Sequence, residues 1–347
     1  MLSERKTCRL CDSEVAPVLE LEPTPIANNF SASPDSNAQR YPLGLTQCTA
    51  CAHVQQRYVA HGLFSDYKYS TPPVTRPYLE DAAEDLQKRF PKAKTVFEIG
   101  CNNGLNLDVL WTQGFIASGI DPVPCTKAGA MQGYFGSKMT WRDDPRFDLI
   151  VSNHVFAHVD DLQDVFKAAV SILDGALVFE VQYLPDLVNR CAFDMIYHEH
   201  RDHHAINPLR AFVSKYGLTI TDVQYVSRQG GSIRLTAQRT GTEVPRVKEE
   251  IDWAQFKSAI ENKKRTLRDK LKGRKIAAFG ASAKACTLIH QCDISQNISC
   301  CIDDDPNKWG LYLPGTDIPI VEKASGPVLL LAWNFDVKHR FPEVIMP

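Results

Sequence analysis

The sequence lacks the features that would connect it to a membrane, to secretion or to nucleic acid. None of its apolar runs approaches the roughly 20 residues that a transmembrane helix needs. The first nine residues are polar and contain no apolar core of a signal peptide. The formal net charge of -2 provides no field that would hold nucleic acid or an acidic membrane. We therefore expect a cytoplasmic protein without membrane or nucleic-acid partners.

Short repeats and low-complexity tracts are also missing from the chain. The remaining features are ordinary for a globular protein: 347 residues, of which 44% are hydrophobic and 23% charged. This length is sufficient for two or three domains with sizeable cores. We expect a monomer with three domains, at residues 1–74, 75–240 and 241–347.

Two pairs of cysteines, Cys8 with Cys11 and Cys48 with Cys51, lie near the N-terminus, each pair separated by two residues. Each CxxC turn directs two sulfurs at one point, and two such turns complete the tetrahedron that Zn²⁺ prefers. Four thiolates leave no open coordination position, so the predicted zinc is structural. The alternative, free thiols or disulfides, is disfavoured in a reducing cytoplasm.

From residue 95 onward, apolar strands alternate with amphipathic helical segments, which is typical of a parallel α/β sheet. The pattern predicts strands at 95–99, 117–120, 147–152, 176–180, 219–226 and 232–239, and helices at 105–113 and 161–173. A charged helical stretch at 248–272 follows, and then a second unit with strands at 275–279, 298–302 and 328–332. We expect the second unit to form a smaller Rossmann-like sheet.

The strand at 95–99 runs into a glycine-containing turn at the start of a helix, where a ligand can approach the backbone closely. Glu98 would repel a pyrophosphate at this position, but it suits a cationic ligand such as S-adenosylmethionine. Asp121, about 20 residues later, is placed to accept hydrogen bonds from a ribose diol. This pattern resembles class I methyltransferases. The resemblance implies the following cofactor-binding residues: Glu98, Gly100, Asn102, Asn103, Gly104, Asp121, Pro122, Asn153 and His154.

The segment from Tyr197 to His204 can be interpreted in two ways. Residues 198–203 spell HxHxDH, which resembles the metal-ligand string of metallo-β-lactamase hydrolases. Such a hydrolase needs further histidine and aspartate ligands downstream, but only His290 and His339 follow, neither at a strand end. It would also leave the upstream α/β sheet unexplained. For His203 and His204, a polar surface helix is a third interpretation.

The longer match over residues 196–200, Ile-Tyr-His-Glu-His, resembles the IYHEH box of the sugar-nucleotide C-methyltransferases. These enzymes transfer methyl to C3 of a 4-keto-deoxysugar attached to a nucleoside diphosphate. The resemblance covers nearly the whole chain, through the cysteine pairs and the segments 40–43, 63–70, 155–159, 230–234, 280–284 and 331–334. It implies an N-terminal zinc-binding domain, a methyltransferase domain that binds S-adenosylmethionine, and a C-terminal domain that binds a nucleotide-linked keto-sugar.

Methylation of carbon requires an enolate, so a base must remove the C3 proton and a donor must stabilise the oxyanion at C4. The resemblance implies that His200 is the base and that Glu199 orients it or tunes its pKa. It also implies that Tyr197, His158 and Tyr69 hold the oxyanion, the sugar or the methyl donor. Two further residues are predicted to bind the substrate: Lys284, at a helix N-terminus beside a glycine turn, and Arg234.

The chain departs from this family at residues 201–205, where relatives carry an aromatic-rich Ser-Tyr-Phe-like stretch and this chain has Arg-Asp-His-His-Ala. Ala285 replaces a family glycine, and residues 71–73 replace a serine-rich run. These changes leave open a methyltransferase that acts on oxygen, nitrogen or a non-sugar ketone. A zinc hydrolase that uses residues 198–203 and a non-catalytic zinc-bearing scaffold are the remaining alternatives.

Overall fold

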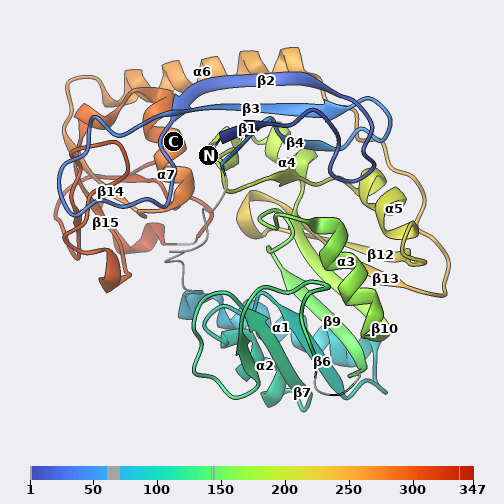
Figure 1. Cartoon of the computed structure of the whole chain (residues 1–347). Coiled ribbons are helices and arrows are strands. Elements are labelled where there is room, and N and C mark those ends of the chain that lie inside the picture. The colour runs from blue at the N-terminus through green and yellow to red at the C-terminus, as the bar shows by residue number, and fades with distance from the viewer. Residues whose placement is uncertain (1, 61–70, 142, 144, 336) are drawn as a thin grey trace.

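The computed structural model describes residues 2–60, 71–141, 143, 145–335 and 337–347, so Tyr69 and the segment 63–70 lie outside the described residues. Three lobes follow one another along the chain (Figure 1). The N-terminal strands lie at the top of the view, the sheet that is coloured cyan to yellow lies below them, and the orange C-terminal sheet lies at the left. The predicted α/β class with three parts is confirmed.

The N-terminal lobe is built on an antiparallel sheet in the order β11-β4-β3-β2. Its strands are β2 (Val15–Thr24), β3 (Tyr41–Cys48), β4 (Val54–Gln56) and β11 (Asp202–His203). A separate two-stranded ladder joins β1 (Leu2–Glu4) to β5 (Tyr58–Ala60). The edge strand β11 comes from the second half of the chain, so the zinc-binding lobe and the segment after residue 200 share one sheet.

The middle lobe has a seven-stranded sheet in the order β12-β13-β10-β9-β6-β7-β8. Its strands are β6 (Thr95–Ile99), β7 (Ile116–Asp121), β8 (Ala130–Gln132), β9 (Phe147–Asn153), β10 (Leu173–Gln182), β12 (Thr219–Val226) and β13 (Ser232–Gln238). The first five are parallel, and β13 is antiparallel to both of its neighbours. Parallel strands are covered on both faces, and this explains the continuous apolar runs from which they were predicted.

Four α-helices accompany this sheet in the described residues: α1 (Arg76–Arg89), α2 (Leu105–Thr112), α3 (Leu162–Ser171) and α5 (Ile206–Ser214). Helix α4 (Leu184–Asn189) lies beside the N-terminal strands in Figure 1, and its buried leucines share their core. Helix α3 begins where the side chain of Asp161 accepts a hydrogen bond from the amide of Asp164 at 3.0 Å. It ends two residues before the predicted end, because Leu173 already belongs to β10.

The C-terminal lobe has a parallel sheet in the order β16-β15-β14-β17-β18. Its elements are β14 (Ile276–Phe279), α7 (Ala283–Cys292), β15 (Ile298–Ile302), β16 (Ile320–Val321), β17 (Val328–Leu330) and β18 (Val344–Ile345). Helix α6 (Trp253–Leu271) lies along β2 at the top of Figure 1. It begins five residues later than predicted, where Asp252 caps the amide of Gln255 at 2.9 Å.

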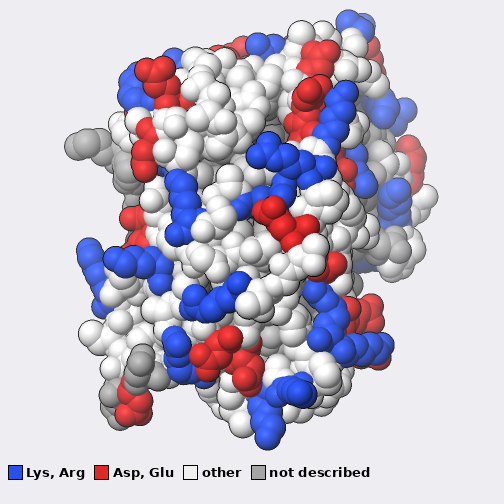
Figure 2. Space-filling view, turned by 90° about the vertical axis from the view of Figure 1, so that its right-hand side faces the viewer, with Lys and Arg blue, Asp and Glu red and all other residues white. Residues whose placement is uncertain are grey.

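Short 3-10 turns complete the described structure, at Pro73–Thr75, Phe193–Met195, Arg228–Gly230, Ser295–Asn297, Pro306–Lys308 and Lys338–Arg340. No helix in the described ranges is long and apolar enough to cross a membrane. Lysine and arginine side chains alternate with acidic ones over the face that Figure 2 shows, without a large area of one sign.

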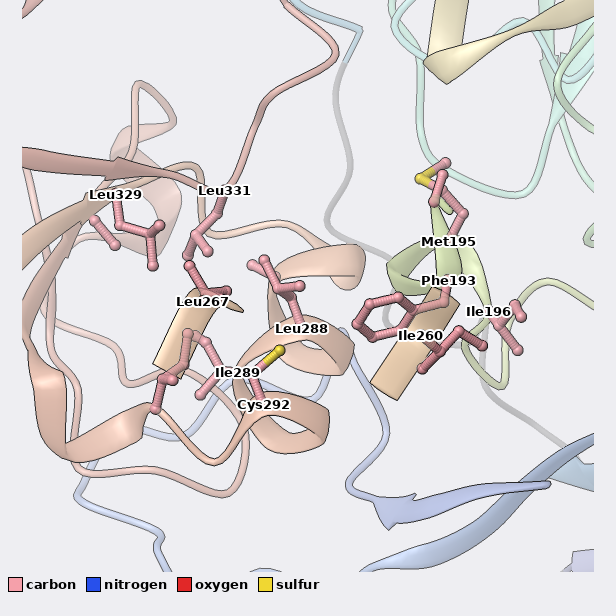
Figure 3. Close-up of a cluster of buried hydrophobic side chains, with 14 of the residues drawn as sticks. Phe193, Met195, Ile196, Ile260, Leu267, Leu288, Ile289, Cys292, Leu329 and Leu331 are labelled. Atoms are coloured by element: carbon pink, nitrogen blue, oxygen red, sulfur yellow. The ribbon is translucent and has the colours of Figure 1, made fainter. Parts of the chain in front are cut away.

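One hydrophobic core holds the segment that leads into residues 196–200. Phe193, Met195 and Ile196 are buried in the same cluster as Ile260 of α6 and Leu288 of α7 (Figure 3). Burying side chains of this size contributes roughly 1.5–3 kcal/mol each to stability. The backbone around residue 195 is therefore held against the C-terminal lobe by this shared core.

Candidate active site

The four predicted zinc ligands converge in the N-terminal lobe. The sulfur of Cys11 lies 3.4 Å from that of Cys48 and 3.5 Å from that of Cys51, and the Cys8 and Cys51 sulfurs are 3.7 Å apart. Tetrahedral coordination with Zn–S bonds of about 2.3 Å places neighbouring sulfurs about 3.8 Å apart. The sulfur cluster therefore fits a zinc ion with four thiolate ligands.

The two CxxC turns have the same backbone form. Asp12 and Ala52, one residue after the second cysteine of each pair, both have φ of 61°. Their amides donate to the carbonyls of Cys8 and Cys48 at 2.9 and 3.1 Å. Both turns are therefore formed by backbone hydrogen bonds that do not involve a metal.

The predicted cofactor turn follows β6. Gly100 has φ of 82°, and a Cβ atom there would lie 2.2 Å from the side chain of Val155. The turn is connected to the end of β7 by Asp121, whose carboxylate accepts hydrogen bonds from the amides of Asn102 and Val123, both at 2.8 Å. Gly104, with φ of 76°, is the N-cap of α2. The turn, the acid and the helix start therefore meet as predicted.

Two asparagines of the turn contact the segment that enters from the N-terminal lobe. The Asn102 Oδ1 atom accepts from the amide of Thr71 at 2.9 Å, and Asn103 Nδ2 donates to the Thr71 carbonyl at the same distance. Pro122 lies beside Asp121, and its carbonyl accepts from Gln132 at 3.3 Å. Thr71 thus lies directly on the predicted cofactor turn.

Glu98 is buried at the end of β6, with 2% of its surface exposed. Burial raises the pKa of its carboxyl to about 8, and Asn106 donates to its Oε1 atom at 2.8 Å. Its Oε2 atom has no hydrogen-bond partner among the described residues. A cation nearby would favour the ionised carboxylate. Glu98 therefore fits the positively charged ligand that the sequence predicted.

A second buried carboxylate, Glu180 at the end of β10, was not predicted. His154 Nε2 lies 2.8 Å from its Oε1 atom, and Arg234 donates to its Oε2 atom at 3.0 Å. Burial alone would raise the pKa of Glu180, but the hydrogen bond from His154 and the charges of His154 and Arg234 outweigh it and leave a pKa of about 2. The sequence did contain a sign of this residue, because Glu180 directly follows the apolar run at 176–179.

Tyr78 of α1 joins the hydrogen-bonded group of Glu180, His154 and Arg234. Its hydroxyl contacts Glu180 and accepts a hydrogen bond from Arg234 at 2.7 Å. A cavity of about 20 Å³, large enough for one water, lies beside it and is lined in part by Asn106, Asn153 and Arg234. The predicted residues Asn153, His154 and Arg234 therefore gather near Glu98. Arg234 is paired with Glu180 and Tyr78 in this group, rather than held for a substrate phosphate as predicted.

Tyr197 and His200 form a buried, hydrogen-bonded pair. The tyrosine hydroxyl is 2.7 Å from His200 Nε2, and the two rings stack with centroids 4.0 Å apart. His200 Nδ1 lies 2.8 Å from the carbonyl of Met195. A carbonyl only accepts, so Nδ1 carries the proton and Nε2 accepts from the tyrosine. Burial holds the pKa of His200 well below its usual value, and the ring is therefore neutral.

Glu199 is held by the N-terminal lobe. The amide and the side-chain nitrogen of Asn28 donate to its Oε1 atom at 3.1 and 3.0 Å, while Oε2 has no partner among the described residues. Burial raises the pKa of this carboxyl. Ile26 and Asn29, which flank Asn28 in the sequence, line a cavity of about 290 Å³. Asn28 has no recognisable signal in the sequence, because its partner is 171 residues away.

His158 completes this arrangement from the loop after β9. Its Nδ1 atom donates to the carbonyl of Glu199 at 2.8 Å, and its ring centroid is 4.7 Å from that of His200. Burial lowers the pKa of His158 to about 4. The side chains of Tyr197, His200 and His158, three of the predicted catalytic residues, therefore lie together and buried, and Glu199 is their neighbour.

The HxHxDH string does not form a metal site. His198 turns toward the carbonyl of Pro42 at 3.2 Å, and Asp202 binds Arg9 and His53. Among the described residues, the four cysteines are the one cluster of metal-binding side chains that converges. Alternating residues of an irregular segment point in different directions, so the spacing of the letters has no geometric counterpart here.

Lys284 lies in the first turn of α7 with 5% of its surface exposed. Its Nζ atom has no hydrogen-bond partner among the described residues and lies 4.7 Å from the ring centre of Trp333. Burial lowers its pKa to about 7, although Asp194 acts in the opposite direction. The neighbouring Ala283 packs against Tyr197, so the start of α7 borders the catalytic group.

The turn after β14 resembles the cofactor turn but is occupied by its own side chains. The amide of Ala281 donates to Asp303 at the end of β15 at 2.7 Å, as Asn102 does to Asp121. Here, however, Lys308 lies 3.4 Å from the Asp303 carboxylate. This second acid is therefore neutralised from within the chain.

Family models match three parts of the chain. Residues 8–61 match a zinc-binding domain, residues 75–223 a methyltransferase domain, and residues 227–339 the C-methyltransferase C-terminal domain. The C-methyltransferase NovU from Streptomyces niveus is 27% identical to this chain, and the alignment covers 97% of this chain and 91% of NovU. With the geometry above, these matches indicate S-adenosylmethionine and a structural zinc ion as cofactors.

Solved structures give weaker matches. Magnesium protoporphyrin IX methyltransferase from Synechocystis is 15% identical with a TM-score of 0.37, over 50% of this chain and 90% of that one. A 1,6-didemethyltoxoflavin N1-methyltransferase from Burkholderia thailandensis is 14% identical with a TM-score of 0.39, over 55% and 97%. Scores this low add nothing to the assignment.

Proposed function

We propose that this chain, whose three parts match a zinc-binding, a methyltransferase and a C-methyltransferase C-terminal domain, methylates C3 of a nucleotide-linked 4-keto-deoxysugar. The observation that carries this proposal is the buried pair of Tyr197 and neutral His200. Such a pair can remove a proton from carbon, a step that methylation of oxygen or nitrogen does not require.

In the proposed first step, His200 Nε2 takes the proton from C3, and the electron pair of the C–H bond forms the enolate with its charge on the C4 oxygen. S-adenosylmethionine, which the turn after β6 with Glu98 and Asp121 would hold, would supply the electrophilic methyl group for the enolate carbon. The imidazolium finally releases its proton to solvent. Burial of this group excludes water, which would otherwise return a proton to the enolate.

His200 is proposed to become a sufficient base only when substrate is bound. Its low pKa keeps it neutral in the free protein, because burial disfavours the imidazolium. An anion that enters the site stabilises the imidazolium and raises that pKa. The anionic substrate is the proposed source of this charge, because Glu199 is already present in the resting site and burial raises its own pKa.

Tyr197 is the proposed donor for the oxyanion, whereas neutral His158, whose Nδ1 proton goes to the Glu199 carbonyl, is proposed to hold the sugar. The tyrosine hydroxyl already contacts the base, and once His200 is protonated, that hydroxyl is released to donate elsewhere. Hydrogen bonds in a buried site are stronger than in water because the local dielectric constant is low. Removing one such donor typically reduces kcat by about 10²–10³.

Lys284 is the proposed contact for the diphosphate. Its amine is buried without a hydrogen-bond partner among the described residues, at the positive end of α7. A buried amine without a partner costs stability unless a ligand compensates it. Because Ala283 packs against Tyr197, a diphosphate at Lys284 would place the attached sugar toward the catalytic pair.

The decisive experiment incubates the purified protein with S-adenosylmethionine labelled in the methyl group and a panel of nucleotide-linked 4-keto-deoxysugars, followed by mass spectrometry and NMR. We expect one added methyl group, resistant to mild acid, on the carbon next to the ketone. A label on oxygen or nitrogen would refute carbon transfer. Matched sugars without the 4-keto group are the control, and we expect no product from them, since their C3 proton is not acidic.

A further inference from the structure

Arg9 lies between two zinc ligands but directs its side chain into the protein. It stands between Cys8 and Cys11, and only 3% of its side chain is exposed. Its amide donates to the Gln55 side chain at 2.8 Å, and its carbonyl accepts from Gln163 at 3.0 Å. The backbone of Arg9 is therefore fixed on both sides, so the direction of its side chain depends on the first CxxC turn.

The Arg9 guanidinium joins the two segments that carry the site histidines. One nitrogen binds the Asp202 carboxylate, two residues after His200. The other contacts the carbonyl of Val159, which directly follows His158, and donates to the carbonyl of Asp160 at 2.8 Å. One side chain thus holds both of the loops whose rings lie 4.7 Å apart.

Asp202 is bound to both CxxC turns. Its side chain is completely buried, and its second oxygen lies 2.8 Å from Nε2 of His53, two residues after the zinc ligand Cys51. The same residue pairs with Gln55 in the ladder between β11 and β4. A single carboxylate therefore receives one contact from the first cysteine turn, through Arg9, and one from the second, through His53.

We propose that Arg9 and Asp202 are positioning residues that transmit zinc occupancy at the four cysteines to the His158–His200 pair. Zinc joins the two cysteine turns, and these turns set the directions of Arg9 and His53. Displacing a catalytic group by about 1 Å can reduce the rate by about 10²-fold. The reaction that would be affected rests on the proposed function, whereas the structural coupling does not.

The proposal also gives residues 201–204 a role other than choice of substrate. Asp202 binds the zinc lobe, and Arg201 is completely buried with its guanidinium 2.5 Å from Asp160. Amides of both residues donate to the carbonyl of Ala157, at 2.7 and 3.3 Å. The family's aromatic stretch is replaced here by polar contacts to the zinc lobe and to the loop that carries His158.

The first test needs no activity. Hydrogen exchange over residues 195–205 is measured by mass spectrometry in the zinc-loaded protein, in protein stripped with a chelator, and in zinc-loaded Asp202→Asn. We expect exchange about tenfold faster in the last two, with Asp202→Asn still holding one zinc per chain. Unchanged protection of residues 195–205 after zinc removal, while the cysteine turns exchange faster, would overturn the proposal.

The second test uses steady-state kinetics of Arg9→Lys, Arg9→Met and Asp202→Asn, with Arg57→Met as the matched control. Arg57 pairs with Glu4 and Glu20 in the same lobe, and its side chain forms no hydrogen bond or ion pair with the catalytic segments among the described residues. We expect kcat to fall about 10–100-fold in Arg9→Met and Asp202→Asn, with KM for S-adenosylmethionine within about twofold. Arg9→Lys, which keeps the charge, should recover part of kcat.

The losses in kcat caused by zinc removal and by Asp202→Asn should not be additive, because both changes disrupt the same contacts between the cysteine turns and the histidine loops. Stripping the wild type should reproduce the loss in kcat, and stripping Asp202→Asn should lower it little further. Independent, multiplying losses would contradict the proposal, as would an Arg57→Met variant as impaired as Arg9→Met. If the wild type methylates no keto-sugar, the proposed function fails, and hydrogen exchange alone decides the coupling.

Discussion

The two halves of the segment from Tyr197 to His204 are equally buried and equally rich in titratable groups, yet they do different things. In the first half, Tyr197 and His200 are hydrogen-bonded to each other, and His200 also bonds to the Met195 carbonyl. The ring of His158 lies beside them. In the second half, Asp202 pairs with Arg9 and His53 of the zinc lobe. Burial and histidine content therefore do not distinguish a proposed catalytic residue from a structural one, whereas the hydrogen-bond and ion-pair partners of the side chain do.

The two halves differ in whether a side chain can still accept a proton from a substrate. His200 is neutral, and its basic nitrogen Nε2 is hydrogen-bonded to the Tyr197 hydroxyl, which can rotate away. The charge of Asp202 is already compensated: burial would raise its pKa, but the charge of Arg9 and the hydrogen bond from His53 outweigh this and hold it well below the usual value. A neutral base can accept a substrate proton, whereas a compensated carboxylate holds a domain interface.

Replacing His200 by Asn tests the reactive half and should have the largest effect. We expect methyl transfer and exchange of the C3 proton with solvent to fall by about 10²–10⁴, because the general base is lost. His198→Asn, the same change two residues away in a side chain that faces Pro42, is the control and should change the rates at most a few-fold. If both reactions persist near wild-type rates in His200→Asn, His200 is not the base.

Replacing Tyr197 by Phe keeps the stacked ring and removes the hydroxyl that contacts His200. We expect kcat to fall about 10–100-fold with KM nearly unchanged, since the lost hydrogen bond acts mainly when charge develops. The acid limb of the kcat profile should also move to higher pH, because Nε2 loses a donor that favours the neutral ring. An unchanged profile would remove Tyr197 from the proton transfer.

The structural half is tested by acid stability. Burial lowers the pKa of His203 to about 3 and of His204 to about 4, whereas the ordinary value is 6.5. Below pH 6.5 the unfolded chain binds protons that the folded chain does not, so stability falls with pH. At pH 5.5 each histidine costs about 1.4 kcal/mol.

The double variant His203→Tyr/His204→Phe restores the aromatic character of the family at these positions and removes both titrating groups. Between pH 7.5 and 5.5, the free energy of unfolding measured in urea should therefore fall less than in the wild type, by roughly 2–3 kcal/mol. Equal falls in both proteins would mean that these rings are not the source of the acid sensitivity.

Lys284→Met should have a smaller effect, confined to substrate binding. We expect KM for the nucleotide sugar to rise about tenfold, with kcat within a few-fold, because one charged contact is lost. Because the pKa of Lys284 is about 7, the wild-type amine is charged below that pH, and KM should rise as pH increases through 7. Lys263→Met, which changes a lysine bound to the Cys191 carbonyl, is the control.

Much of the fold was predictable because its signals are local. The continuous apolar run at Thr95–Ile99 forms a buried parallel strand, and the two cysteine pairs converge as their spacing indicates. Element ends were less predictable, since α6 begins at a capping residue rather than at the start of its charged stretch. Helical periodicity identifies an element, but the capping residue and the packing decide where it begins and ends.

The candidate site divides in the same way. The residues that we propose as reactive, Tyr197, Glu199 and His200, lie within four positions of the sequence, so a resemblance in five letters was enough to single them out. The groups that hold them were not predictable. The carbonyl of Met195 has no side-chain signal, and Asn28 lies 171 residues from Glu199. Tyr78 and Glu180 are likewise 102 residues apart and meet only across the sheet.

The sequence by itself determined which side chains are present and which short-range geometries they favour: zinc turns, a glycine turn after a strand, and a residue box with a base. Only the tertiary structure decided that Asp202 binds residues of the zinc lobe while His200, two residues earlier, pairs with Tyr197 and the Met195 carbonyl. The physical reason is range. Hydrogen bonds and ion pairs act over a few ångströms in space, and chain folding, not spacing along the chain, decides which residues come that close.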